Sequence, residues 1–181
     1  MRIFALSAAL ILLSPMSVQA GDVDPGGTLN PDEMTWQSVV ERAAQGESSM
    51  VICATGYMLT KQGDHTAART VFETCAADGF TGAMTWMSQL DNNGLGGVYD
   101  PDAAAEWDRR AADAGDPVGQ FNYGIDLIRG HGVAQDAARG RDLVDQAAAA
   151  GLVVAQRLRS AEYDLDVVTP DADNWKYAPL F

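Results

Sequence analysis

The sequence repeats itself at an interval of 36 residues, and this regularity limits the possible folds more than any other feature. Gly79, Gly115 and Gly151 are separated by that interval twice over. Four further sets of positions keep it: Ala76, Ala112 and Ala148; Gly94 and Gly130; Gly96 and Gly132; Asp100 and Asp136. A repeat of this length is typical of a solenoid, in which each unit buries its apolar face against the next one.

Each unit has the pattern of two helices. Residues 80–91 and 117–129 are the first helices of two units, and each segment leads into a glycine-rich loop that can end a helix. Asp100 is suited to capping the second helix of its unit, with Pro101 at the first helical position, and that helix runs to Ala114. Asp136 occupies the same place in the next unit, where the second helix runs to Ala150. The sequence therefore predicts an all-α protein.

Shorter units flank the two regular ones. Residues 31–44 have the pattern of a lone second helix, residues 48–61 and 65–78 form a helix pair around Gly63, and residues 152–162 resemble a lone first helix. Half-units at both ends would cap the apolar faces of the array. The predicted organisation is a half-repeat at 31–46, repeats at 46–78, 79–114 and 115–150, a capping helix at 151–162 and a tail at 163–181. Trp175, Tyr177, Leu180 and Phe181 of the tail either fold back onto the last helix or stay loose.

The third unit resembles the Sel1-like repeat, which has the pattern A-x4-G-x5-G-x-G-V-x2-D, then an apolar residue, then A-A-x2-G. The matching residues are Gly119, Gly124, Gly130, Gly132, Val133, Asp136, Leu143, Ala147, Ala148 and Gly151. The second unit departs from the pattern, because Ser88 stands where glycine is usual and Asp91 stands where an aromatic residue is usual. The resemblance covers residues 31–162 and implies an α/α superhelical solenoid of TPR-like helix-turn-helix repeats, in an exported bacterial protein. It implies a binding role without naming a partner.

Within such a fold, the two cysteines are predicted to form a disulfide. Cys53 lies ten residues before Gly63 and Cys75 lies twelve residues after it, so that an antiparallel helix pair brings them nearly level. Cys75 also occupies the position of Ala111 and Ala147, which should face the partner helix. The alternative is a pair of buried free thiols. Some cysteine-rich Sel1-like proteins bind β-lactams, and their cysteines link each second helix to the next first helix. The same linkage here would need a cysteine near Ala83, and this sequence has none there.

The first twenty residues have the pattern of a secretory signal peptide. Arg2 is followed by an apolar run from Ile3 to Leu13, and Val18-Gln19-Ala20 supplies the small residues of a cleavage site. A buried N-terminal helix is the alternative. Cleavage after Ala20 predicts a periplasmic or secreted protein that starts at Gly21, with residues 21–30 as a linker and no inserted membrane segment after cleavage. Removing Arg2 leaves a net charge of 11 − 25 = −14, which argues against nucleic-acid binding and is explained by solubility or by a basic partner.

Catalytic and cofactor motifs are not found in the sequence. His65 and His131 have no second metal ligand three or four residues away, so a zinc site is not expected. We therefore expect no enzyme activity, no cofactor and no bound metal.

The first helices of a helical solenoid line its concave surface, where binding is expected. Aligning the units places six residues on that surface: Ala54, Tyr57, Trp86, Gln89, Asn122 and Ile125. Trp86 is either a binding residue or a cover for an alanine-rich core, whereas Phe72, Trp107 and Trp36 are predicted to be core residues. Our primary hypothesis is a periplasmic, monomeric, non-catalytic module that binds a protein partner. The alternative is a binder or weak hydrolase of small cell-wall-type ligands, such as β-lactams, which an apolar and polar pocket around Trp86 with a perturbed acid would favour.

Overall fold

The computed structural model describes residues 35–168, and this part of the chain contains eight α-helices, one short 3₁₀ helix and no strand. The expected signal peptide, the linker and the aromatic residues of the tail lie outside it. Within the described part, no helix combines the length and the apolar character needed to cross a membrane. The described helices belong to one compact unit.

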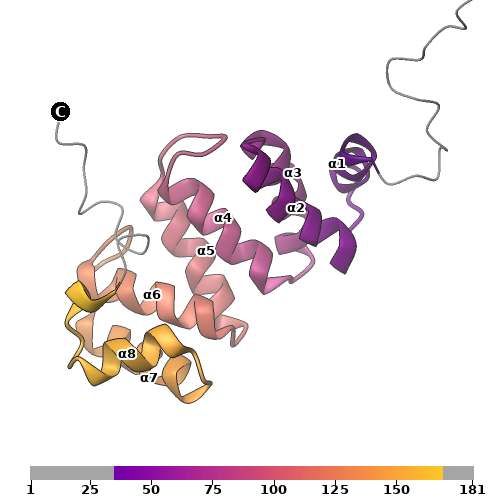
Figure 1. The fold of residues 1–181 in the computed structure, drawn as a ribbon. Helices are drawn as coiled ribbons and strands as arrows, with labels where there is room; N and C mark the ends of the chain where they lie inside the picture. The colour runs from indigo at the N-terminus through magenta and orange to yellow at the C-terminus, as the bar shows by residue number, and fades with distance from the viewer. Residues whose placement is uncertain (1–34, 169–181) are drawn as a thin grey trace, which may run out of the picture. The chain divides into compact units, whose positions relative to one another are not determined.

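Figure 1 labels the helices in chain order. They are α1 (Trp36–Ala44), α2 (Met50–Gln62), α3 (His65–Ala77), α4 (Thr81–Asn92), α5 (Pro101–Asp113), α6 (Pro117–Arg129), α7 (Ala137–Ala149), α8 (Val153–Ser160) and the 3₁₀ helix η1 (Leu165–Val167). From α2 to α8, each helix begins and ends within two residues of its predicted bounds.

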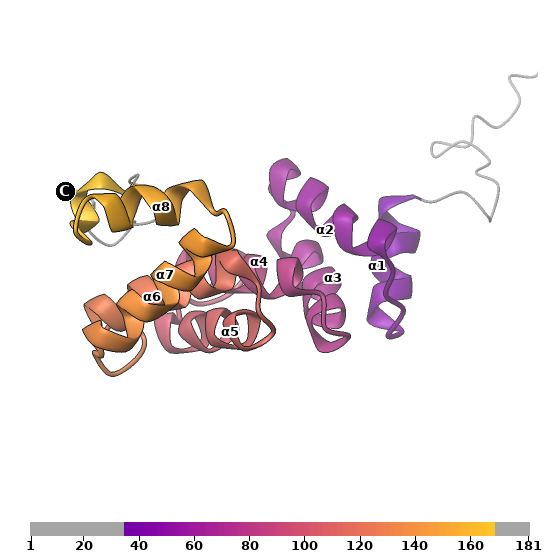
Figure 2. The ribbon, with the colours of Figure 1, turned by 90° about the horizontal axis from the view of Figure 1, so that it is seen from below.

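The helices pack in successive pairs, α2 with α3, α4 with α5 and α6 with α7, and each second helix also contacts the first helix of the next pair. Figure 2 shows the same succession from below. α1 packs on α3, and α8 packs on α7, so that a single helix covers each end of the array. This is an α/α repeat solenoid, as predicted.

Aspartates cap the second helices, as the sequence predicts for Asp100 and Asp136. The side chains of Asp64, Asp100 and Asp136 each accept a hydrogen bond from the backbone N–H three residues later, at 3.0–3.1 Å. These bonds satisfy N–H groups that have no partner within the helix. Gly63 and Gly130 adopt the left-handed conformation at the ends of α2 and α6.

Two sequence interpretations need correction at the N-terminal end of the described region. α1 begins at Trp36 and not at Pro31, because Thr35 is extended and caps the helix through its side chain, 3.0 Å from Ser38 N. Trp36, interpreted as a core residue, exposes 45% of its surface. Phe72 is a core residue as predicted, whereas Trp107 is only partly buried and lies beneath the guanidinium of Arg110.

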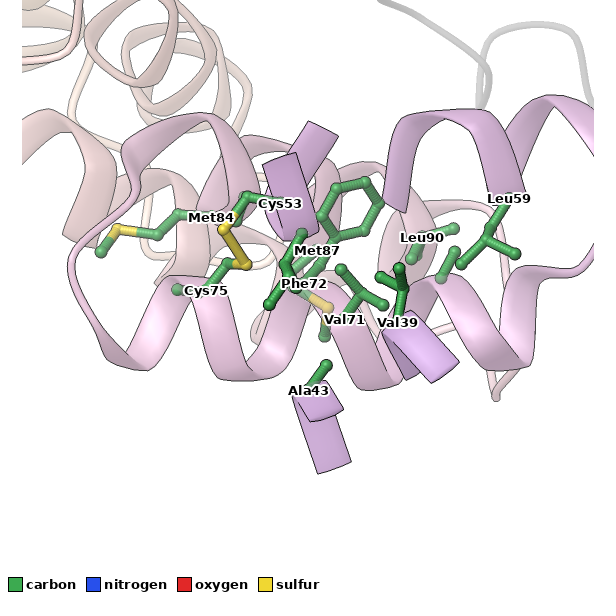
Figure 3. Close-up of a cluster of buried hydrophobic side chains, with 14 of the residues drawn as sticks. Val39, Ala43, Cys53, Leu59, Val71, Phe72, Cys75, Met84, Met87 and Leu90 are labelled. Carbon is green, nitrogen blue, oxygen red and sulfur yellow. A yellow bond between two sulfur atoms is a disulfide. The ribbon is translucent and has the colours of Figure 1, made fainter. Parts of the chain in front are cut away.

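The main hydrophobic cluster joins α1 to α4 and contains the predicted disulfide. Phe72, Ile52, Met87 and Leu90 are its largest fully buried side chains. Cys53 and Cys75 are bonded to each other across α2 and α3, with their Cα atoms 5.8 Å apart, and Figure 3 shows the bond within the cluster. The covalent bond therefore ties together the two helices of the first repeat.

Candidate binding groove

Three adjoining hollows run along the first helices α2, α4 and α6, and together they are called the groove here. The aromatic pocket lies between α2 and α4, the trough crosses from α2 to α6, and the acid pocket lies between α4, α5 and α6. Trp86 lines both the aromatic pocket and the trough, while Gln89 and Asn122 line both the trough and the acid pocket. Because neighbouring hollows share wall residues, the groove is continuous across three repeats.

The aromatic pocket has a volume of about 350 Å³ and is built around Trp86. The Trp86 ring stacks on Phe72, with centroids 5.9 Å apart and an interplanar angle of 4°, and contacts Tyr57 at 5.4 Å. Lys61 places its ammonium 5.2 Å from the centroid of the Tyr57 ring. These contacts hold Trp86 in place while one side of it remains available in the pocket.

All six residues that the sequence placed on the first-helix surface line the groove. Ala54 and Tyr57 line the aromatic pocket and are exposed. Gln89 is exposed, and Trp86 and Asn122 are half-buried. Ile125 differs from the others because it exposes only 4% of its surface and packs in a hydrophobic cluster, although it borders the acid pocket.

The acid pocket is small, about 50 Å³, and Asp108 forms part of its wall. Asp108 exposes only 4% of its surface and accepts hydrogen bonds from Ser88 Oγ and from Asn122 Nδ2, the latter at 3.1 Å. Burial raises the pKa of Asp108 well above its usual value, and the nearby Asp126 raises it further. The three hydrogen-bonded residues come from α4, α5 and α6, so this polar cluster also joins the second repeat to the third.

Asp126 is the second carboxyl group in the wall of this pocket. Burial raises its pKa to about 7, although Arg129 acts in the opposite direction. It exposes 8% of its surface, and among residues 35–168 no side chain or backbone N–H donates a hydrogen bond to its carboxylate. His131 Nε2 lies 2.7 Å from Asn92 Oδ1 and orients the Asn92 side chain at the same pocket.

Nowhere in the described part of the chain are three histidine, cysteine, aspartate or glutamate side chains grouped so that they could hold a metal ion. The groove instead combines an aromatic surface, an open trough and two acids of raised pKa, which is a binding chemistry for a ligand with both apolar and polar parts.

Comparison with known proteins identifies the repeat. No protein-family model matches the sequence, and no curated protein matches it. Among solved structures, a Sel1 repeat protein from Oxalobacter formigenes matches with 26% sequence identity and a TM-score of 0.54, over 68% of this chain and 96% of that one. The chain therefore shares the fold of the Sel1-like repeat proteins.

Two other Sel1-type structures share the fold. Cysteine-rich protein B of Helicobacter pylori has 17% identity and a TM-score of 0.55, over 67% of this chain and 90% of its own. A protective antigen of uropathogenic Escherichia coli strains that displays an SLR fold has 21% identity and a TM-score of 0.51, over 77% of this chain and 36% of its own.

The sequence analysis missed Asp108 and Asp126, although an alignment of the Sel1-like repeats reveals them. Asp108 aligns with Phe72 and Val144, and Asp126 aligns with Met58 and Leu90, so that each acid replaces an apolar residue. A polar residue at a position that is apolar in the other units indicates either that another polar residue pairs with it or that it serves the function of the protein. The departure of Ser88 from the Sel1-like consensus was noticed, but not the carboxyl group that it contacts.

Proposed function

We propose that this Sel1-like repeat protein is a non-catalytic interaction module that binds a segment of another protein in the groove. The observation that carries this proposal is the continuity of the groove across α2, α4 and α6, with Trp86 at the junction of two of its parts. A groove that spans three repeats is long enough to contact several consecutive residues of a partner.

The chemistry of the groove supports a protein ligand. Tryptophan and tyrosine are frequent among the residues that dominate binding energy at protein interfaces. Trp86 is stacked on Phe72 and contacts Tyr57, so little side-chain entropy would be lost when a partner covers it. The trough, about 660 Å³, is lined by apolar and polar residues together, including Val118, Gln89 and Asn122.

The test combines site-specific photo-crosslinking with a variant that fills the aromatic pocket. A photo-crosslinking amino acid at Gln89 should capture a protein from an extract of the source cells, whereas the same amino acid at Glu73, exposed on α3, should not. Ala54→Arg places a long side chain in the pocket without removing a core residue, and should lower affinity for the identified, purified partner at least tenfold. Ala77→Arg is the matched control, because Ala77 is an exposed alanine of α3.

Two results would contradict the proposal. Capture from position 73 as strong as that from position 89 would mean that binding is not specific to the groove. Equal affinity of the purified partner for Ala54→Arg and for Ala77→Arg would exclude the aromatic pocket as its site.

A second candidate function, the binding of a small cell-wall-type ligand, is favoured by one observation. The aromatic pocket has the volume of a small-ligand site, and Asp126, with its raised pKa, lies further along the same groove. A rise in melting temperature with muropeptides or a β-lactam, which Ala54→Arg abolishes, would support this candidate. Release of a hydrolysed product in the same mixtures would extend it to weak hydrolase activity.

We also propose that the protein is exported and acts as a monomer in the periplasm or outside the cell. The Cys53–Cys75 disulfide supports export, because such bonds persist in oxidising compartments. Mass spectrometry of the protein recovered from the periplasm or medium should give a chain beginning at Gly21. Light scattering should give the mass of one chain.

A further inference from the structure

The acid pocket is the most unusual feature of the groove, because Asp126 is buried there and receives no hydrogen bond from the described residues. Asp126 lines the cavity and exposes 8% of its surface. A buried carboxylate that lacks donors is costly, and its cost falls when a cation approaches it. Burial is the main cause of the raised pKa of Asp126, and the nearby charge of Arg129 offsets it only in part.

The groups around Asp126 can accept hydrogen bonds from a cation. Asn122 donates its Nδ2 to Asp108, which leaves the Asn122 carbonyl oxygen as the acceptor end of the amide. Ser88 Oγ donates to Asp108 and keeps its lone pairs, and Gln89 lines the same cavity. An ammonium group needs three acceptors, which this arrangement supplies.

The sizes of the acid pocket and the trough indicate which kind of cation would fit. At about 50 Å³ the acid pocket has room for an ammonium group, since a single water molecule needs about 10–15 Å³ by such a measure. The adjoining trough has a wall formed by Trp86, Leu95 and Val118, against which an aliphatic chain can lie. This combination suits the four-carbon stem and compact charge of lysine better than the broad, planar guanidinium of arginine.

The aromatic pocket and the acid pocket lie close enough for one short segment to enter both. Trp86 and Asn92 are six residues apart on α4, which corresponds to about 9 Å along the helix axis. An extended peptide covers that distance in about three residues. Lys61 lines the trough on its α2 side and would repel a second cation there.

We propose that the acid pocket binds the ammonium group of a lysine in the partner segment, and that an apolar side chain about three residues away occupies the aromatic pocket. This inference rests on the proposed function, and it specifies the chemistry of the partner. It is also consistent with the net charge of −13 of the full sequence, since an acidic protein attracts basic segments.

The test uses capped synthetic peptides that contain one phenylalanine and one lysine separated by one, two or three alanines. Each peptide has two counterparts, in which norleucine or arginine replaces the lysine. Binding to the mature protein is measured by NMR through the indole signal of Trp86. For at least one spacing, the lysine peptide should bind at least tenfold more tightly than its norleucine counterpart and more tightly than its arginine counterpart.

Variants of the protein locate the effect. Asp126→Asn should reduce the preference for lysine over norleucine to less than threefold, while the affinity for the norleucine peptide stays unchanged. Asp142→Asn removes the same charge from an exposed position of α7 and should leave the preference intact. Unchanged affinity for the norleucine peptide also shows that the Asp126→Asn variant is folded.

Three outcomes would overturn the inference. Equal binding of lysine and norleucine peptides would remove the cation site but leave binding in the groove, and hence the proposed function, standing. A preference for arginine would contradict the small ammonium pocket. If no peptide binds, a lysine-containing segment is not the partner, and the crosslinking at position 89 still tests the proposed function independently.

Discussion

Replacing Asp126 by asparagine should stabilise the protein at neutral pH and make its stability less dependent on pH. Burial raises the pKa of Asp126 from 3.8 to about 7. Between these two values the folded protein holds a proton that the unfolded chain releases. Since the unfolded state binds fewer protons in this window, the free energy of unfolding falls as the pH rises through it.

The pKa values give the size of the effect. Their difference is about 3 units, and at about 1.4 kcal/mol per unit Asp126 costs the folded protein roughly 4 kcal/mol above pH 7. The favourable contribution is complete below about pH 4, is lost as the pH rises to about 7, and changes no further above that. The asparagine side chain of the variant does not titrate. The difference in unfolding free energy between variant and wild type should therefore grow by about 4 kcal/mol from pH 4 to pH 8.

Urea unfolding followed by far-UV circular dichroism, at several pH values from about 4 to about 8, measures this difference. Asp126 also raises the pKa of Asp108, so that the variant should lose part of the pH dependence that Asp108 contributes. Asp142→Asn is the control for removal of a negative charge. A difference that is the same at every pH would show that Asp126 is not held protonated in the folded protein, and the reasoning would fail.

Two further predictions concern stability. Replacing Cys53 and Cys75 together by alanine should lower the free energy of unfolding by about 3 kcal/mol, because the disulfide closes a loop of 22 residues, and urea unfolding of the wild type in reductant should approach the same value. Gly132→Ala should destabilise the protein by more than about 2 kcal/mol, since the new Cβ would overlap the carbonyl oxygen of Pro101 and φ is +64°. Gly46→Ala is the control, because Gly46 has φ +90° and no atom lies within 4 Å of the added Cβ. It should lower the free energy of unfolding by about 1 kcal/mol in thermal unfolding, which gives the backbone contribution alone.

The sequence was sufficient to predict the repeat helices because their signals are local. Asp100 and Asp136 mark helix starts, and Gly130 marks a helix end, through contacts that span three or four residues. The disulfide was also predictable, because an antiparallel pair with a known turn fixes which residues are level. The predicted start of α1 was wrong because the sequence offers two helix-start signals, the proline at position 31 and the capping residue Thr35, and the pattern did not distinguish between them.

The groove was predictable only in part. Repeat alignment placed Trp86, Gln89 and Asn122 on its walls, because equivalent positions of a solenoid lie on one surface. The choice between binding residue and core cover for Trp86 is not exclusive, since it packs on Phe72 and lines the aromatic pocket at the same time. The acid pocket could not be predicted in this way, because the burial of an acid depends on the neighbouring helices. Asp108 is enclosed by Ser88 of its own repeat and by Asn122 of the next one.

Three acids of the middle repeats, Asp91, Asp108 and Asp126, stand at positions that are apolar in other repeats. They differ in whether other residues of the protein pair with them, and this difference indicates which acid serves binding. Asp91, at the consensus aromatic position, forms an ion pair with Arg69 of the preceding repeat. Asp108 takes the place of Phe72 and Val144, and Ser88 takes the place of Gly56 and Gly124, so that one polar pair replaces two apolar contacts.

Asp126 alone among these three acids receives no hydrogen bond from the described residues. A structural role would explain an acid that is hydrogen-bonded better than it explains Asp126, which has only the attraction of Arg129, because an apolar residue such as Leu90 would fill the same position at lower cost. The free energy that folding loses at Asp126 is available to a ligand that brings a positive charge. The same burial that weakens the fold at neutral pH therefore favours the binding of a cation in the acid pocket.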